Sequence, residues 1–313
     1  MTGDFYNPAA IGFTEVVSFR VNVENPKVLS VDADSNICVA GENKIVFYSR
    51  YGHQEREIPI RQNLTAMCTP KSETLFDRKI LLAYENQVEV IEPDGKLLQK
   101  ISDFPEGAWL VDIKTDKNHL YASDCVNKAV YVLDIEGKIL QTLAKDKVYS
   151  DDKEAFPGFF VPSPYFAMDC DDTGTLWVAN PLKHQLTAFS GGTVWEPSKT
   201  WGKESLSAPD AFTGCCNPAD FAIFRDGRFV TVEKQVQKIK LFLPTGEFIT
   251  YIANPSHFDP VQHLFEESAD HQLTKKETSL WKPTLQVDVL SDDQVVVLDP
   301  ENRKIFVFTE GLN

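Results

Sequence analysis

Two adjacent cysteines, Cys215 and Cys216, are the residues of this chain whose type and spacing point most directly to chemistry. A disulfide between neighbouring residues closes a strained ring and distorts the peptide bond inside it. Left reduced, the two thiols present a pair of soft sulfurs on one short piece of backbone. Such a pair suits Cu(I), Hg(II) or As(III), or a reversible disulfide. We therefore predict that Cys215 and Cys216 form a reactive or metal-liganding pair. A rigid vicinal disulfide that braces a loop is the structural alternative.

The elements that position this pair emerge from an internal repeat. Six segments begin with a polar turn, continue as an alternating apolar strand and end near a glycine; they cover residues 40–48, 83–91, 124–133, 180–189, 233–242 and 299–308. Two apolar strands precede each segment, and an outer strand follows most of them. Four antiparallel strands repeated six times are typical of a β-propeller, whose blades close into a ring.

The sequence therefore predicts an all-β, six-bladed propeller formed by residues 1–313 as a single domain. The last repeat ends at Asn313 after its third strand, without a fourth. The alternating segment 15–21 precedes the first complete repeat. We predict that this N-terminal strand completes the last blade and closes the ring.

The same topology predicts where a site would form. The innermost strands of a propeller all start at one mouth of the central channel, and the second strands end there. Cys215, Cys216 and Asn217 precede an innermost strand, and Glu233 and Lys234 end the second strand of the same blade. We therefore expect these five residues to be neighbours.

Other blades should bring Arg61 and Lys282 to this mouth, where Arg61 and Lys234 would supply positive charge. Three long connections, 146–163, 197–217 and 255–282, contain aromatic residues, including Trp281, and are predicted to cap the mouth. We predict Asn217, Glu233, Arg61, Trp281 and Lys282 as ligand-binding residues beside the catalytic candidates Cys215, Cys216 and Lys234.

Each candidate also has a structural interpretation. For Glu233 we favour a hairpin cap that bonds local backbone N–H groups, because the aligned repeats carry Asp124, Asn180 and Asp299. Lys234 replaces a cysteine and two prolines in those repeats, and its charge beside a thiol would favour the thiolate. Asp169 and Asp288 recur at the far end of inner strands, which predicts a structural role.

The repeats resemble NHL repeats, in which a short strand ends in Asp and a turn with Asn leads to a strand and a glycine. Residues 124–137 and 299–311 match this pattern best. Together with the 212–218 segment (Phe-Thr-Gly-Cys-Cys-Asn-Pro), Glu233 and Lys234, they look like a subgroup of bacterial NHL-type propellers. The resemblance implies the fold more than an activity. NHL-like lyases and lactonase relatives hold a channel metal with His or acidic ligands, and no comparable set is visible here.

Composition excludes several classes of function. A net charge of −15 argues against nucleic-acid binding, which requires a basic stripe. The sequence has neither an 18-residue apolar run nor a signal peptide, which predicts a soluble protein, cytoplasmic or exported without its signal. The six cysteines are too scattered for a disulfide scaffold, and Cys38, Cys68 and Cys170 fit buried strand positions.

Two hypotheses follow. In the first, a monomeric propeller binds a small molecule or a soft metal ion such as copper at a capped channel mouth, or uses the thiols in redox chemistry. In the second, it is a protein–protein interaction scaffold in which the cysteines form a structural disulfide. The fold alone does not choose between them.

Overall fold

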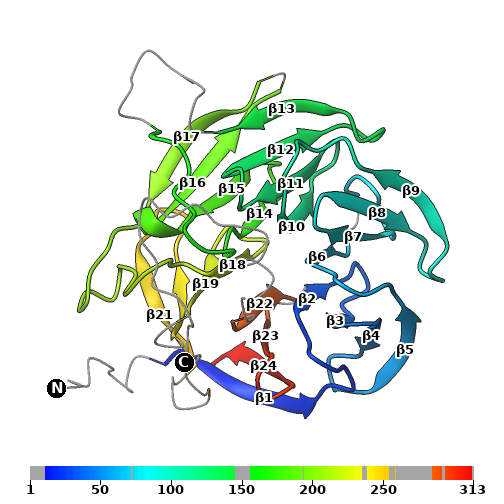
Figure 1. The fold of residues 1–313 in the computed structure, drawn as a ribbon. Helices are drawn as coiled ribbons and strands as arrows, with labels where there is room; N and C mark the ends of the chain where they lie inside the picture. The colour runs from blue at the N-terminus through cyan, green and yellow to red at the C-terminus, as the bar shows by residue number, and fades with distance from the viewer. Residues whose placement is uncertain are drawn as a thin grey trace.

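The structure of the protein is a computed structural model that describes residues 11–71, 73–144, 156–192, 194–234, 238–253, 258, 284–290 and 293–311. Six four-stranded antiparallel sheets form the blades, and the innermost strands contact one another in the order β2, β6, β10, β14, β18, β22 and back to β2. Figure 1 shows the sheets arranged around a central axis. The predicted six-bladed propeller is confirmed. The described residues contain no helix of the length and apolarity that crossing a membrane requires.

The strands follow the chain blade by blade, from the innermost strand outward. Blade 1 comprises β2 (Val28–Val31), β3 (Ile37–Ala40), β4 (Lys44–Tyr48) and β5 (Gln54–Pro59). Blade 2 comprises β6 (Ala66–Cys68), β7 (Ile80–Tyr84), β8 (Gln87–Ile91) and β9 (Leu97–Ile101). Blade 3 comprises β10 (Leu110–Thr115), β11 (Leu120–Asp124), β12 (Ala129–Leu133) and β13 (Ile139–Leu143).

The second half repeats this plan. Blade 4 comprises β14 (Met168–Cys170), β15 (Leu176–Asn180), β16 (Gln185–Ser190) and β17 (Glu196–Trp201), with the 3-10 turn η2 (Pro181–Lys183) between β15 and β16. Blade 5 comprises β18 (Asp220–Ile223), β19 (Phe229–Glu233), β20 (Lys238–Phe242) and β21 (Phe248–Ala253). Blade 6 comprises β22 (Gln286–Val289), β23 (Val295–Asp299) and β24 (Lys304–Glu310), and β1 (Phe13–Arg20) is its fourth strand.

The core lies between the blades. Each of six clusters of buried apolar side chains joins two neighbouring sheets, so that every blade packs on both of its faces. The second strands β11, β15, β19 and β23 are therefore buried along their whole length. Outer strands such as β5 expose most of their residues. This gradient explains why the second strands have continuous apolar runs and the outer ones do not.

The predicted ring closure is confirmed. The N-terminal strand β1 pairs antiparallel with the C-terminal strand β24, from Phe13 opposite Glu310 to Arg20 opposite Lys304. In Figure 1 the blue β1 lies beside the red β24. Both ends of the chain thus belong to one blade, and the ring is held closed by backbone hydrogen bonds.

The prediction that residues 197–217 form a loop is wrong in part. Residues 196–201 of the expected 197–217 connection form β17, which pairs with β16. This strand was hidden because an outermost strand pairs on one side only and faces solvent, which tolerates its Pro197 and its polar residues. Residues 156–163 of the 146–163 connection are described and contain no strand. The 255–282 connection lies outside the described residues, apart from Phe258, whose ring lies 5.3 Å from that of Phe306.

Candidate functional site

The segment before β18 is bonded to the end of β19, as the topology predicts. The Thr213 N–H donates to Glu233 Oε2 at 2.6 Å, and the Lys234 N–H donates to Asn217 Oδ1 at 3.0 Å. Asn217 Nδ2 donates to the Thr213 carbonyl at 2.6 Å. These bonds fix both ends of the short turn that carries the two cysteines.

Neither cysteine of this turn forms a disulfide. Their sulfur atoms lie 3.1 Å apart; Cys215 is half-buried and Cys216 is fully buried. Cys216 has a φ of 59°, in the left-handed region that residues with a side chain rarely adopt. Such a conformation costs about 1–3 kcal/mol and persists where surrounding bonds hold it. The turn therefore presents two preorganised sulfurs.

A buried ion pair lies under the turn. Lys240 Nζ lies 2.5 Å from Glu233 Oε1, and both side chains are almost completely inaccessible. Lys240 Nζ also donates to the Ala211 carbonyl at 2.6 Å. Burial lowers the pKa of Lys240, and the Glu233 carboxylate opposes that shift. Glu233 thus accepts an N–H from the segment before β18, whereas the hairpin that it was predicted to cap, residues 235–237, lies outside the described residues. The ion pair adds a role that the sequence did not indicate.

The other predicted site residues lie in different parts of the molecule. Lys234 is buried, with Nζ 4.7 Å from the centre of the Tyr165 ring. Arg61 bonds Glu89 at 3.1 Å and packs over Tyr84 in blade 2, which is opposite blade 5 in the ring. Arg61 and the cysteines therefore belong to opposite blades, and the contacts that the structure shows for the Arg61 side chain lie within blade 2. Trp281 and Lys282 lie outside the described residues.

The central channel is a separate feature. It has a volume of about 1150 Å³ and is lined by the innermost strands of all six blades, whereas neither Cys215 nor Cys216 lines it. The cysteine turn lies just before the lumen-lining residues of blade 5, because only Asn217 and Pro218 separate Cys216 from Ala219, which lines the channel.

Aspartates join the blades around this channel. Each accepts the next residue's N–H with Oδ1 and an N–H of the following blade with Oδ2, an arrangement that we call the aspartate clasp. The inter-blade bonds are 2.7–2.9 Å long and run from Asp112 to Met168, Asp169 to Ile223, Asp220 to Val287, and Asp288 to Val31. The structural role predicted for Asp169 and Asp288 is confirmed. Ser30 and Thr69 form the equivalent link between blades 1 and 2.

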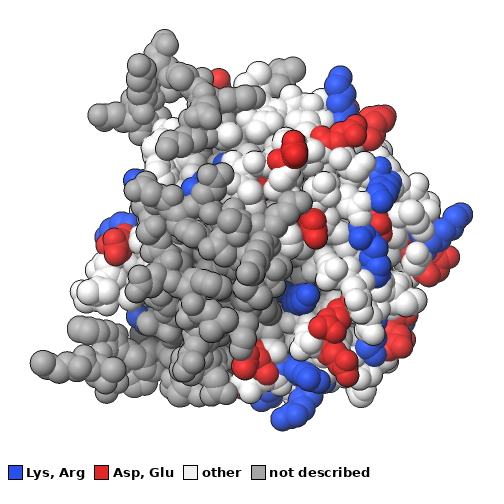
Figure 2. Space-filling model, in the orientation of Figure 1, with Lys and Arg blue, Asp and Glu red and all other residues white. Residues whose placement is uncertain are grey.

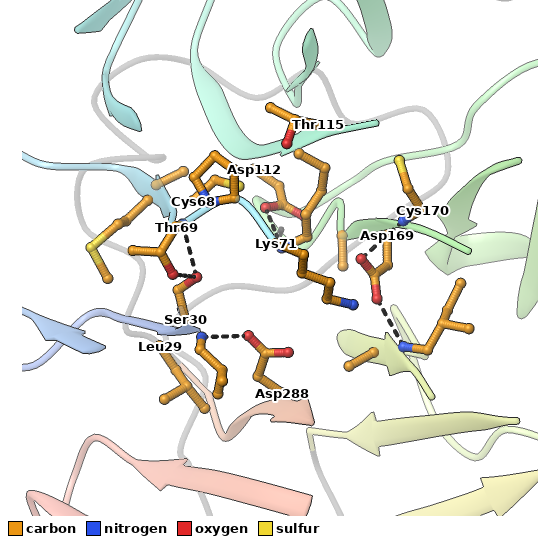
Figure 3. Close-up of a pocket in the computed structure, with 18 of the residues that line it drawn as sticks. Leu29, Ser30, Cys68, Thr69, Lys71, Asp112, Thr115, Asp169, Cys170 and Asp288 are labelled. Atoms are coloured by element: carbon orange, nitrogen blue, oxygen red, sulfur yellow. Dashed lines mark hydrogen bonds and ion pairs between the residues drawn. The ribbon is translucent and has the colours of Figure 1, made fainter. Parts of the chain in front are cut away.

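Two lysines, Lys71 and Lys114, share the lumen with these carboxylates, and Figure 3 shows Lys71. Lys114 Nζ lies 3.3 Å from Asp112 Oδ1. Burial disfavours the charge on Lys114, but Asp112, reinforced by Asp169, raises its pKa well above the usual range. Lys71 extends into the lumen, where the Asp169 carboxylate, reinforced by Asp288, raises the pKa of Lys71 although burial opposes the shift. The channel interior therefore favours ammonium groups.

Asp220 should make folding stability depend on pH. Burial, reinforced by Asp112, raises the pKa of Asp220 from 3.8 to about 8, although Lys114 and the Val287 N–H lower it. Between these values the folded state binds a proton that the unfolded state has released, so stability falls as pH rises. We expect the free energy of unfolding of wild type, relative to Asp220→Asn, to fall by up to about 1.4 kcal/mol per unit between pH 4 and 8. Above pH 8 the difference should level off.

Urea denaturation at several pH values measures this difference directly. Asp112 and Asp288 are present in both proteins, so their contributions cancel in the comparison. A difference that stays constant from pH 5 to 8 would show that Asp220 is ionised throughout.

The polar residues of the channel leave a weak but detectable pattern in the sequence. Polar residues recur at every second position of the inner strands, as in Asp112 and Lys114 or Gln286 and Asp288. That period places them on the same side of a strand. Lys71 follows β6 and has no such pattern, so its position in the lumen was not predictable from spacing.

Comparison with known proteins bears on the fold. The sequence matches no protein-family profile, and no curated protein is significantly similar to it. A streptogramin B lyase structure superimposes with a TM-score of 0.55 at 12% identity, covering 97% of this chain and 100% of that one. A catalytically inactive virginiamycin B lyase from Staphylococcus aureus with quinupristin gives 0.53 at 14% identity, covering 91% and 80%.

A third similar structure is the Swd1 β-propeller domain of Myceliophteria thermophila, with a TM-score of 0.57 at 8% identity, covering 96% of this chain and 100% of that domain. Identities this low establish a shared fold and not a shared activity. The chain is a β-propeller, a fold compatible with ligand binding and with protein interaction.

Proposed function

We propose that this protein is an NHL-type propeller that binds a soft, thiophilic centre through Cys215 and Cys216. The observation that supports this most strongly is the pair of sulfurs 3.1 Å apart, not joined in a disulfide, on a turn bonded at both ends. The half-buried Cys215 gives a ligand access, and the buried Cys216 excludes water from one side. Bonds from Asn217 and Glu233 keep the turn in place before a ligand arrives, which reduces the entropy cost of binding.

The spacing of the sulfurs narrows the class of ligand. A tetrahedral centre bonded to two sulfurs at about 2.3 Å separates them by about 3.8 Å, and a linear centre by about 4.6 Å. A separation of 3.1 Å corresponds to an angle of roughly 85° at a centre held at that same distance of about 2.3 Å. Trivalent arsenic, whose three bonds are close to perpendicular, fits this angle better than linear Cu(I) or Hg(II). We therefore favour a pyramidal thiophilic centre.

Charged and aromatic residues complete the proposed site. Lys234 and Tyr165 border the Asn217 end of the turn, where the Lys234 N–H binds Asn217. Trp281 and Lys282, in the 255–282 connection, are proposed to cover the ligand. The protein would act as a monomer on a small molecule or ion and without nucleic acid. In Figure 2 Lys and Arg side chains are interspersed with Asp and Glu on the described part of one face, a distribution unlike a basic stripe.

Titration with phenylarsine oxide tests the proposal. Its arsenic forms two As–S bonds, and its oxygen leaves as water with the two thiol protons. We expect calorimetry to show one equivalent bound by wild type. Cys215→Ser and Cys216→Ser should each weaken binding at least about 100-fold, because one As–S bond remains and chelation is lost.

Cys125→Ser is the matched control, because Cys125 follows Asp124 in the equivalent hairpin of blade 3 and is buried. It should bind like wild type. The double serine variant should melt within a few degrees of wild type, because neither sulfur belongs to an inter-blade core cluster. Binding that survives in the double variant would contradict the proposal.

An interaction scaffold is the second candidate function. Aliphatic side chains are exposed along the outer edges of blades 2 to 4: Leu97, Leu98, Ile135, Leu140 and Val194. Exposed apolar groups on neighbouring elements mark interaction surfaces when they are contiguous. If a partner protein binds there, serine at Leu97 and Leu98 should abolish its binding and the cysteine variants should not.

A further inference from the structure

The central channel holds more carboxylates than ammonium groups. Asp112, Asp169, Asp220 and Asp288 line it from four consecutive blades, and Lys71 and Lys114 lie among them. The other basic residues that line the channel precede or follow inner strands: Lys27, Lys117 and Arg225. Backbone N–H groups donate hydrogen bonds to each carboxylate. These groups carry no full positive charge, so they do not neutralise the carboxylate. The aspartate clasps therefore place more acidic groups than ammonium groups inside the protein, and above pH 8, where Asp220 is ionised, they leave an excess of negative charge.

The positions of Lys71 and Lys114 show which aspartates have an ammonium group nearby. Lys114 forms an ion pair with Asp112. Figure 3 shows the Lys71 side chain extended between Asp169 and Asp288. Lys71 is exposed to solvent, and among the described residues no group forms a hydrogen bond or ion pair with Lys71 Nζ. Water in the lumen and the field of the two carboxylates therefore stabilise its ammonium group.

Asp220 is the carboxyl group whose charge neither Lys71 nor Lys114 neutralises by a direct contact. It lines the channel and is half-buried, so one side of it faces the lumen. No described lysine or arginine forms an ion pair with it, and Lys114 acts on it only at a distance. A second cation entering the channel would therefore find its most favourable position at Asp220.

The size and chemistry of the lumen favour an organic cation over a metal ion. The described residues contain no group of three His, Cys, Asp or Glu side chains that could hold a metal. A calcium ion requires six to eight oxygen ligands and magnesium near-octahedral geometry. A cavity of about 1150 Å³ instead accommodates a small molecule. Further acids, Asp32, Asp116 and Asp171, line the end of the lumen where the inner strands finish.

We propose that the channel is a second binding site, separate from the thiol pair, that takes a small aliphatic diamine with one ammonium group on Asp220. The other ammonium group lies toward Asp32, Asp116 and Asp171. The ligand completes the charge balance that Lys71 and Lys114 begin, and its methylene chain replaces water in the lumen.

The probe for this site is 1,4-diaminobutane, titrated into the full chain by calorimetry at constant ionic strength and at a pH just above 8, where Asp220 is ionised and the diamine is still protonated. Wild type should bind it with one-to-one stoichiometry, and 1,4-butanediol should not bind. Asp220→Asn should weaken binding at least about tenfold, because the loss of a charge-assisted bond of this kind is worth that much. Circular dichroism and melting curves establish that the variant is folded.

A second variant tests the charge argument in the opposite direction. Lys71→Met removes an ammonium group and keeps every clasp, so the diamine should bind more tightly than to wild type. The double serine variant at Cys215 and Cys216 should bind the diamine unchanged, which separates this site from the thiol site. The proposal is overturned if wild type does not bind at millimolar diamine, if Asp220→Asn binds like wild type, or if Lys71→Met binds more weakly.

Discussion

Deleting residues 1–20 is expected to open the propeller ring and cost several kcal/mol of stability. The deletion removes β1, which supplies the fourth strand of blade 6 through its pairing with β24. It also removes Phe13 from the core between blades 5 and 6, and Val17 and Phe19 from the surface of the core between blades 6 and 1. The melting temperature should fall by about 10 °C, or the cooperative transition should disappear.

The exposed edge of β24 should also promote association, because an unpaired strand edge is a template for other chains. A control that lacks only residues 1–10 retains all of β1 and should melt close to the full chain. Differential scanning calorimetry and light scattering measure both effects. Equal melting of the two truncated proteins would mean that β1 does not hold the ring closed.

The second large effect is expected from Lys240→Met. This substitution leaves Glu233 buried without its cationic partner, and removing one member of a buried pair typically costs about 3–5 kcal/mol. The same carboxylate accepts the Thr213 N–H, so the cysteine turn should loosen as well. Urea denaturation should show the lower stability, and faster alkylation of Cys215 should show the looser turn.

Two matched variants test whether the unpaired buried charge of Glu233 causes the stability loss of Lys240→Met. Adding Glu233→Gln to Lys240→Met removes the unpaired charge while the amide oxygen can still accept from Thr213, so much of the stability should return. Lys44→Met breaks the exposed pair with Glu57, at 3.0 Å, and should cost less than about 1 kcal/mol. A loss for Lys240→Met no larger than that for Lys44→Met would show that the pair is not buried in solution.

The fold was largely predictable because its repeat is local. Alternating strands, polar turns and turn glycines recur in each blade. The last repeat has only three strands, so a four-stranded blade could be completed only by the N-terminal strand. The strand β17 was not predictable in this way, since its residues are polar and contain Pro197. Outer strands contribute little to the core, so hydrophobic periodicity is weak where burial is weak.

The candidate site was predictable only where it depended on topology within one blade. Asn217, Glu233 and Lys234 lie beside the cysteine turn because β18 and β19 are neighbours. Arg61 belongs to the opposite blade, and its contacts with Glu89 and Tyr84 could not be predicted from the repeat. The Glu233–Lys240 pair escaped prediction because an inward-pointing lysine in a strand has the same sequence pattern as an outward one.

The most direct test of the proposed thiol function is the mass and location of the adduct formed with one equivalent of phenylarsine oxide on the folded protein. If the two thiols bind the arsenic, we expect a single adduct whose mass reflects the loss of one water. Cys215 and Cys216 should both be protected from iodoacetamide under native conditions. Subsequent treatment with a small dithiol should release the arsenic and restore labelling of Cys215. An adduct that forms only after denaturation, or that maps to other cysteines, would contradict it.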